Sequence, residues 1–178
     1  MPDNISKNIA LIGFMGSGKT TIGKELARRM GWTFLDSDKL IREKEKCTIP
    51  EIFEKYGEVY FRQCERAILT EVASLEKIAL ATGGGLPTCE ENWEILHRGF
   101  YTVYLKVNFD ILFERIAGDR SRPLLQKYPT RDQLKELYLS RICWYERAHV
   151  IIDTTHKKVD VIVGEIIKRA RINDSNQR

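Results

Sequence analysis

The stretch GFMGSGKTT, residues 13–21, constrains this chain more than any other part of its sequence. It follows a short apolar run at residues 9–12 and precedes a helical pattern that places Ile22, Leu26 and Met30 on one face. The spacing Gly-x-x-x-x-Gly-Lys-Thr is that of a phosphate-binding loop. Glycines let backbone N–H groups turn toward phosphate oxygens, and the following helix points its positive end at the anion. A chance glycine-rich turn is the alternative, but it would not need this strand and helix on either side.

Two polar side chains of this loop add chemistry to the backbone. Lys19 can reach the terminal phosphates of a nucleoside triphosphate, and the hydroxyl of Thr20 is placed to bind a magnesium ion. The apolar Phe14 and Met15 either pack near the ligand or belong to the core. The chain has no Asn-Lys-x-Asp guanine signature, and its 178 residues are few for an ATP-driven motor. A small phosphotransferase is therefore the favoured class.

Strand-like and helical segments alternate along the whole chain. The apolar, strand-like runs lie at residues 9–12, 33–35, 78–81, 101–105 and 150–152. This alternation predicts an α/β fold of the P-loop NTPase type, with three layers and a five-stranded parallel sheet flanked by helices. We expect one domain over residues 1–178, with a phosphate loop at 13–20 and a tail at 172–178 that frays.

Polar or glycine-rich segments follow the predicted strands, and carboxyl ends of parallel strands meet at one edge of a sheet. Asp36 and Asp38 come after the second strand, and in an extended chain they would point to the same side. One acid could hold magnesium through water while the other accepts a proton, but Asp is also a common helix cap. Gly83, Gly84 and Gly85 follow the third strand and either approach a ligand closely or form a flexible turn. The residues alone leave these alternatives open.

A segment rich in Gly, Pro and Arg at residues 118–130 breaks the helical pattern and predicts a mobile loop of a length that is usually functional. Two further arginines, Arg62 and Arg141, lie within helical patterns. A guanidinium group can hold a carboxylate through two hydrogen bonds, although an arginine on a helix more often faces solvent. Spacing alone does not bring these groups together.

The bulk properties favour a cytoplasmic protein with an anionic ligand. The formal net charge is +4, and the charges are interspersed, so we expect no nucleic-acid partner. No apolar run approaches the roughly 20 residues that cross a membrane, and residues 1–7 lack a signal-peptide core. We expect the four cysteines, Cys47, Cys64, Cys89 and Cys143, to be buried reduced thiols.

Taken together, the motifs resemble those of the shikimate kinase family. The matching pieces are GFMGSGKTTIGKELA, FLDSDKLI, IPEIFEKYGEVYFRQCE, TGGGLP, DRSRPLL and SRICWYERAHVIIDTT, in the family's order over about residues 9–167. Gluconate kinase, which shares the loop but not the set of DSD, GExxFR, GGG and RPLL, is the alternative. A regulatory protein that kept this fold but lost turnover is a second alternative, against which the intact motifs argue.

The resemblance implies transfer of the γ-phosphate of ATP, with Mg²⁺, to the 3-hydroxyl of shikimate, a step of aromatic amino acid biosynthesis. It implies that Asp38 contacts the shikimate hydroxyls and is the catalytic base. Thr20 and Asp36 would serve the magnesium ion. Lys19 and Arg122 would be catalytic through the charge that they neutralise on the transferred group.

The same resemblance assigns the binding residues and favours a monomer. The nucleotide-binding residues would be Gly16, Ser17, Gly18, Lys19, Thr20, Thr21, Arg115 and Arg122. The shikimate-binding residues would be Asp38, Arg62, Gly83, Gly84, Gly85, Arg122 and Arg141. Most of the substrate-binding region would then lie at about residues 36–66, and the lid at 118–130 would bring Arg122 to both substrates.

Overall fold

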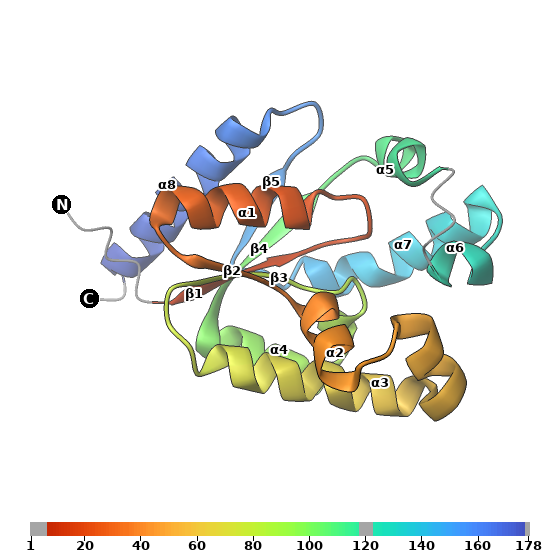
Figure 1. Cartoon of the computed structure of the whole chain (residues 1–178). Helices are drawn as coiled ribbons and strands as arrows, with labels where there is room; N and C mark the ends of the chain where they lie inside the picture. Colours follow the sequence, from red (N-terminus) through yellow and green to blue (C-terminus); the bar gives the residue numbers. More distant parts are fainter. Residues whose placement is uncertain (1–6, 118–122, 177–178) are drawn as a thin grey trace.

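A parallel β-sheet forms the centre of the computed structural model, which describes residues 7–117 and 123–176 (Figure 1). Its strands are β1 (Asn8–Ile12), β2 (Thr33–Asp36), β3 (Ile78–Ala81), β4 (Phe100–Lys106) and β5 (Val150–Asp153). The five strands lie in the order β2-β3-β1-β4-β5, and every neighbouring pair is parallel. The predicted five-stranded parallel sheet is confirmed, and β1, which precedes the phosphate loop, is its central strand.

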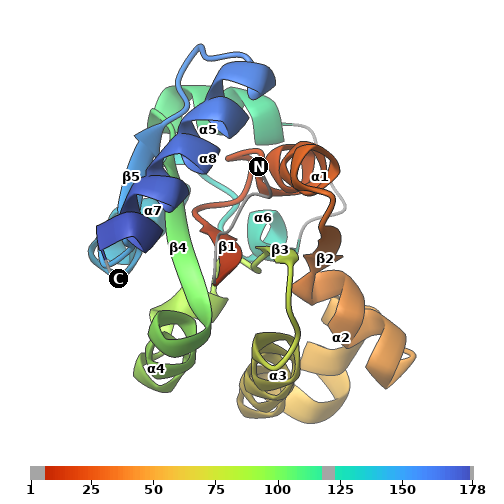
Figure 2. The same ribbon diagram turned by 90° about the vertical axis from the view of Figure 1, so that its left-hand side faces the viewer.

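Helices cover both faces of the sheet. They are α1 (Lys19–Met30), α2 (Ser37–Glu45), α3 (Ile49–Ala73), α4 (Glu90–Gly99), α5 (Phe109–Ile116), α6 (Pro123–Lys127), α7 (Arg131–Tyr145) and α8 (Val159–Asn176), with a short 3₁₀ turn η1 (Leu86–Thr88). Figure 2 shows α1 and α8 on one side of the sheet and α3 and α4 on the other. Each side has its own buried apolar cluster, so the three-layer fold is confirmed.

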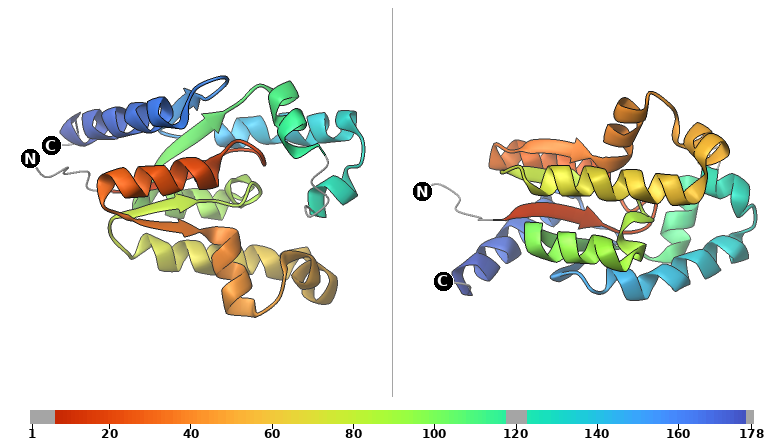
Figure 3. Two further views of the ribbon diagram at one scale, coloured as in Figure 1. Left: turned by 45° about the horizontal axis from the view of Figure 1, so that its top comes forward. Right: turned by 90° about the horizontal axis from the view of Figure 1, so that it is seen from below.

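The three central strands β3, β1 and β4 are buried on both faces, as expected for a parallel sheet between helices, whereas the edge strands β2 and β5 are partly exposed. All five residues of β1 and all four of β3 are buried. Successive side chains of β1 therefore alternate between the two cores: Leu11 packs with Leu26 of α1, and Ile12 packs on the other side with Trp93 of α4. The carboxyl ends of the strands face the region where α2, α5 and α6 lie (Figure 3).

The last helix continues to Asn176, and the fraying expected at residues 172–178 stays a prediction. The expected lid differs from its prediction in detail. Residues 118–122 of the expected lid, with Arg122, lie outside the described residues, and the part that follows contains α6 instead of a continuous loop. No helix in the described part of the chain is both long enough and apolar enough to cross a membrane.

All four cysteines are free, but the expectation that they are buried is wrong for most of them. Only Cys64 is buried, Cys47 and Cys89 are partly buried, and Cys143 is exposed. The reason for Cys143 is its place on α7. The buried residues of that helix recur with helical spacing from Leu134 to Tyr145 and define one face, and Cys143 lies on the other.

A histidine joins β4 to the start of β5 at the end of the sheet away from the phosphate loop. The backbone N–H of Thr102 donates to His149 Nδ1 at 3.1 Å, and the backbone N–H of His149 donates to Thr102 Oγ1 at 3.0 Å. Because Nδ1 accepts a backbone N–H, it cannot carry a proton itself. Burial, with the nearby charges of His97 and Lys7, lowers the pKa of His149 below its usual 6.5.

This contact predicts a stability that falls on acidification. A histidine whose pKa is lowered by folding stabilises the protein above its unfolded pKa, and the contribution is lost as the pH falls through the folded pKa. Urea unfolding of wild type should therefore be compared with that of His149→Asn, which keeps an acceptor but does not titrate, between pH 8 and 5. The free energy of unfolding of wild type relative to this variant should fall below about pH 6.5. Relative to His156→Gln it should not change with pH. An equal fall in wild type and His149→Asn would contradict the assignment.

Candidate active site

The phosphate loop leaves β1 and turns directly into α1, as its spacing predicted. Gly16 and Gly18 have φ values of 79° and 90°, in the left-handed region that favours glycine. The Lys19 ammonium group donates to the carbonyl oxygens of Gly13 at 2.8 Å and Phe14 at 2.9 Å. The lysine therefore lies across its own loop, at the N-terminal end of α1, where phosphate oxygens are favoured.

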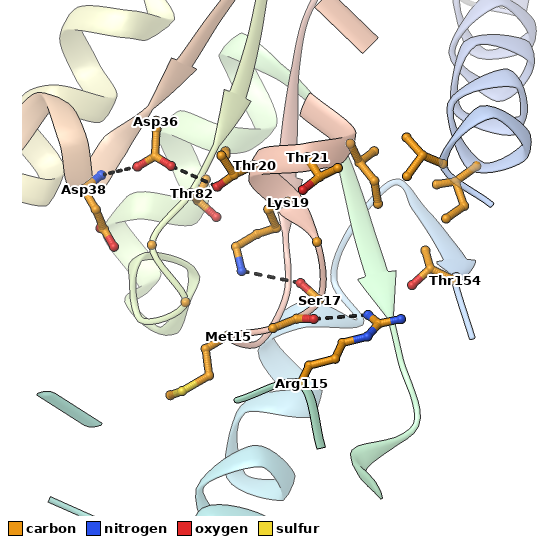
Figure 4. Close-up of a pocket in the computed structure, with 18 of the residues that line it drawn as sticks. Met15, Ser17, Lys19, Thr20, Thr21, Asp36, Asp38, Thr82, Arg115 and Thr154 are labelled. Carbon is orange, nitrogen blue, oxygen red and sulfur yellow. Dashed lines mark hydrogen bonds between the residues drawn. The ribbon is translucent and has the colours of Figure 1, made fainter. Parts of the chain in front are cut away.

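A cavity of about 520 Å³ opens beside this loop (Figure 4). Its lining combines the loop and start of α1, the two acids after β2, the glycines after β3, Arg115 of α5 and the chain around Thr154. A cavity of this size holds a small-molecule ligand, and its lining comes from the carboxyl ends of the strands, where ligands of α/β proteins bind. Arg115 is fixed beside the loop by a hydrogen bond from Nη1 to Gly16 O at 3.2 Å.

Asp36 caps a helix and contacts the loop at the same time. Its Oδ1 accepts the backbone N–H groups of Asp38 and Lys39, each at 3.1 Å, which makes it the N-cap of α2. Its Oδ2 accepts the hydroxyl of Thr20 at 3.2 Å (Figure 4). The expectation that Asp36 and Asp38 share an extended chain is wrong, because Ser37 already begins α2. Asp38 reaches the cavity from the first turn of a helix.

The hydroxyl of Thr20 and the carboxylate of Asp36 suit a magnesium ion that arrives with a nucleotide. Mg²⁺ prefers oxygen ligands, keeps several waters, and binds through one or two protein groups and the phosphates of its substrate. No group of three or more His, Cys, Asp or Glu side chains that could hold a metal exists within residues 7–117 and 123–176. The donor set therefore fits an ion shared with phosphates, and it does not fit a metal held by protein ligands alone.

Asp38 lines the cavity, and the hydrogen bonding of its carboxylate is incomplete among the described residues. Its Oδ1 is buried and has no hydrogen-bond partner among the described residues. Burial, followed by the charge of Asp36, raises the pKa of Asp38, and the nearby Lys19 opposes that shift. A buried acceptor without a donor is costly unless a ligand supplies one. A ligand hydroxyl would complete this site.

Three charged side chains lie against the three glycines after β3, and two of these glycines, Gly83 and Gly85, leave no room for a Cβ atom. A Cβ atom on Gly85 would lie 2.7 Å from Arg62 Nη1, and one on Gly84 would lie 3.5 Å from Arg141 Nη1. A Cβ atom on Gly83 would collide with Asp38 Oδ1. We call residues 83–85 the glycine strip. None of the three has a positive φ, so at Gly83 and Gly85 the site requires the missing side chain and not an unusual backbone.

Two arginines approach this strip from different helices. Arg62 of α3 donates to Glu65 at 2.6 Å and to Glu58 at 3.0 Å, so it is already paired. Arg141 of α7 is only 9% exposed, and its Nη1 has no hydrogen-bond partner within the described part of the chain. A buried guanidinium N–H without an acceptor favours an anionic ligand group such as a carboxylate.

Glu65 is a site residue that the sequence reasoning missed. Its side chain is 1% exposed and lies near the charges of Arg62, Asp38 and Arg141. Burial raises its pKa to about 7, although Arg62 opposes the shift. A signal was present: Glu65 lies in the apolar stripe of its helix, between Phe61 and Ile68, where a carboxylate needs a buried partner.

The structure gathers most of the predicted site residues around one cavity. The predicted residues that line it are Gly16, Ser17, Gly18, Lys19, Thr20, Thr21, Asp36, Asp38, Gly83, Gly84 and Arg115. Gly85, Arg62 and Arg141 are not among the lining residues but adjoin them through the glycine strip. Arg122 lies outside the described residues.

Comparison with known proteins gives a consistent family. A family model described as shikimate kinase matches residues 15–171. The shikimate kinase of Trichormus variabilis is 39% identical over 174 residues, which cover 93% of this chain and 96% of that protein. A solved structure of shikimate kinase from Acinetobacter baumannii in complex with shikimate has 40% identity and a TM-score of 0.88, with 94% of each chain covered.

The predicted alternative also has a structural counterpart. A gluconokinase structure from Sinorhizobium meliloti covers 97% of this chain and 96% of its own, with a TM-score of 0.61. Its identity to this chain is only 18%, so the likeness extends to the fold alone.

The buried position of Glu65 predicts an unusual titration. Folding should place the pKa of Glu65 near 7, because desolvation penalises the carboxylate more than Arg62 stabilises it. Carbon-detected NMR titration of the glutamate side chains should show this midpoint, and Glu25, which accepts hydrogen bonds from Arg28 and Arg29, should titrate near 2. A midpoint for Glu65 near 4.5, its ordinary value, would mean that the arginines fully offset its burial.

Proposed function

The chain belongs to the shikimate kinase family, and we propose which of its residues carry out that family's reaction. The protein transfers the γ-phosphate of ATP to the 3-hydroxyl of shikimate, which yields shikimate 3-phosphate for aromatic amino acid biosynthesis. The observation that carries the proposal is the pair of unpartnered groups at the glycine strip. Among the described residues, Asp38 offers an acceptor without a donor, and Arg141 offers a donor without an acceptor.

Shikimate supplies both missing partners, because it carries a carboxylate and neighbouring hydroxyls on one ring. Its carboxylate would bind Arg141 and Arg62, and its hydroxyls would donate to Asp38. The raised pKa of Asp38 makes its carboxylate a stronger base than an exposed aspartate. Asp38 would therefore accept the proton of the 3-hydroxyl as that oxygen attacks the γ-phosphorus. Gly83, Gly84 and Gly85 would leave space for the ring.

ATP would bind with its phosphates along the loop. The phosphates would be held by the backbone of Gly16, Ser17 and Gly18 and by the side chain of Lys19, with Thr21 beside them. Arg115 would lie beside the adenine base. Thr20 would bind a magnesium ion directly and Asp36 would hold it through water. When bound, this ion neutralises phosphate charge and orients the nucleotide. Alignment of the two substrates supplies much of the rate in such reactions.

The role of Arg122 and the lid remains a prediction from the sequence. Arg122 and the lid at residues 118–130 would close over both substrates and exclude water, which would otherwise compete as acceptor. We further propose that the enzyme is a cytoplasmic monomer that needs neither nucleic acid nor a membrane. Light scattering on the purified protein measures its oligomeric state.

The reaction itself is tested by its acceptor. With ATP and Mg²⁺, coupled ADP release should depend on shikimate and not on quinate or gluconate. ADP release with gluconate alone would mean that the protein is a kinase with gluconate as its substrate. If ATP binds but no acceptor causes ADP release, the protein would more plainly fit a regulatory role.

Loss of the base should lower turnover selectively. Asp38→Asn should reduce kcat by about 10²- to 10⁴-fold, the usual contribution of a general base, because the amide cannot accept the proton. The KM for ATP should change little, since the phosphate loop is intact. Steady-state ADP release measures both. Turnover within a few-fold of wild type would remove Asp38 from the mechanism.

A methyl group on the glycine strip should displace an arginine. In Gly85→Ala the new Cβ would lie 2.7 Å from Arg62 Nη1, so the guanidinium must move. The KM for shikimate should rise on the order of tenfold to a hundredfold, as for a lost hydrogen bond to a charged group, with the KM for ATP unchanged. Gly164→Ala on α8, where a Cβ meets nothing within 4 Å, is the matched control and should keep wild-type kinetics. An equal rise in both KM values would point to a general disturbance of the fold.

A further inference from the structure

The phosphate loop contains an aromatic residue, Phe14, that the assignments above do not use. Its side chain is 1% exposed, and the Arg141 guanidinium carbon lies 5.8 Å from the centre of its ring. We propose that Phe14 is a positioning residue that holds Arg141 in place for the substrate carboxylate. The inference rests on the proposed role of Arg141.

Arg141 needs support of this kind because it is buried and no residue in the described ranges pairs with its Nη1. The negative face of an aromatic ring attracts a guanidinium group, and the attraction grows when water is excluded. A ring also has no hydrogen-bond acceptor in its plane, so it leaves the N–H groups of Arg141 free for a ligand. Glu65, in contrast, already pairs with Arg62. An aromatic support can thus hold the arginine without competing with a carboxylate.

Neighbouring tyrosines fix the ring and the helix that carries Arg141. The ring of Tyr138, one turn before Arg141 on α7, packs edge-on against Phe14 at 5.5 Å and 88°. The Tyr138 hydroxyl donates to Val107 O at 3.2 Å, and the Tyr145 hydroxyl, one turn after Arg141, donates to Gly84 O at 2.7 Å. Arg141 therefore lies between two anchored turns of α7.

Phe14 also connects the two halves of the site. Its carbonyl oxygen accepts the ammonium group of Lys19 at 2.9 Å, while its ring faces Arg141. Phe14 thus contacts both Lys19, which we propose binds phosphate, and Arg141, which we propose binds the carboxylate. If Phe14 only packed in the core, its burial would be explained, but its substitution would not change how the site distinguishes a charged substrate from an uncharged one.

The test compares shikimate with its uncharged methyl ester. Phe14→Leu keeps an apolar side chain but removes the aromatic face. It should lower kcat/KM for shikimate by roughly 3- to 30-fold, the range of cation–π contributions, and leave the KM for ATP unchanged. The preference for shikimate over the ester should fall by the same factor. A loss that is equal for acid and ester would overturn the proposal, because it would reflect packing alone.

Two further variants make the result specific. Phe109→Leu is the matched control, because Phe109 packs on the same Tyr138 at 5.5 Å but its ring faces Arg131 instead of Arg141. Its preference for shikimate over the ester should equal that of wild type, and a fall as large as in Phe14→Leu would overturn the proposal.

Arg141→Ala separates this inference from the proposed function. This variant should lose the preference for the acid, and adding Phe14→Leu to it should cause no further loss. A preserved preference in Arg141→Ala would mean that Arg141 does not bind the carboxylate, so the proposed function of that residue would fail. A lost preference in Arg141→Ala with a preserved one in Phe14→Leu would overturn only the role of Phe14.

Discussion

The parallel pairing of β1 with both β3 and β4 is the constraint on which the rest of this structure depends. Parallel strands put all their carboxyl ends at one edge, so the segments that follow them meet even when they are far apart in sequence. The phosphate loop follows β1, the glycine strip follows β3, and Asp36 ends β2 beside it. The register Leu11↔Ala81 places the loop and the strip level with each other. The site is a direct result of this edge.

Charge organises the site within that frame. Asp38, Glu65, Arg62 and Arg141 lie near one another in a partly buried region, so the pKa of each acid depends on its neighbours. Removing one partner from such a set leaves another charge buried and unpaired, which costs more than the pair itself contributes. Arg62 is already paired with Glu65 and Glu58, whereas Arg141 Nη1 has no hydrogen-bond partner within the described part of the chain. Arg141 is therefore the group of this set that best suits the carboxylate of an anionic substrate.

The sequence predicts what is local and misses what side chains do after the chain has folded. The phosphate loop and the five strands follow from spacing and apolar runs, which act over a few residues. The orientation of Asp38 was expected from an extended chain, but the capping preference of Asp36 starts a helix one residue earlier. Glu65 was missed because the apolar pattern around it hides a charged residue. Spacing could not show that each glycine of the strip faces a different side chain, because these contacts join β3 to three separate helices. The family resemblance supplied those roles, and Arg122 stays a prediction.

The glycine strip has a consequence for molecules designed to block this enzyme. A compound that lies against the backbone of residues 83–85 would contact atoms that belong to no side chain. A substitution at Gly83 or Gly85 that pushed the compound away would also push against Asp38 or Arg62. A resistance substitution at these positions would therefore lower the activity of the enzyme as well as the affinity of the inhibitor. Inhibitors that bind this strip thus leave few substitutions that give resistance and keep the enzyme active.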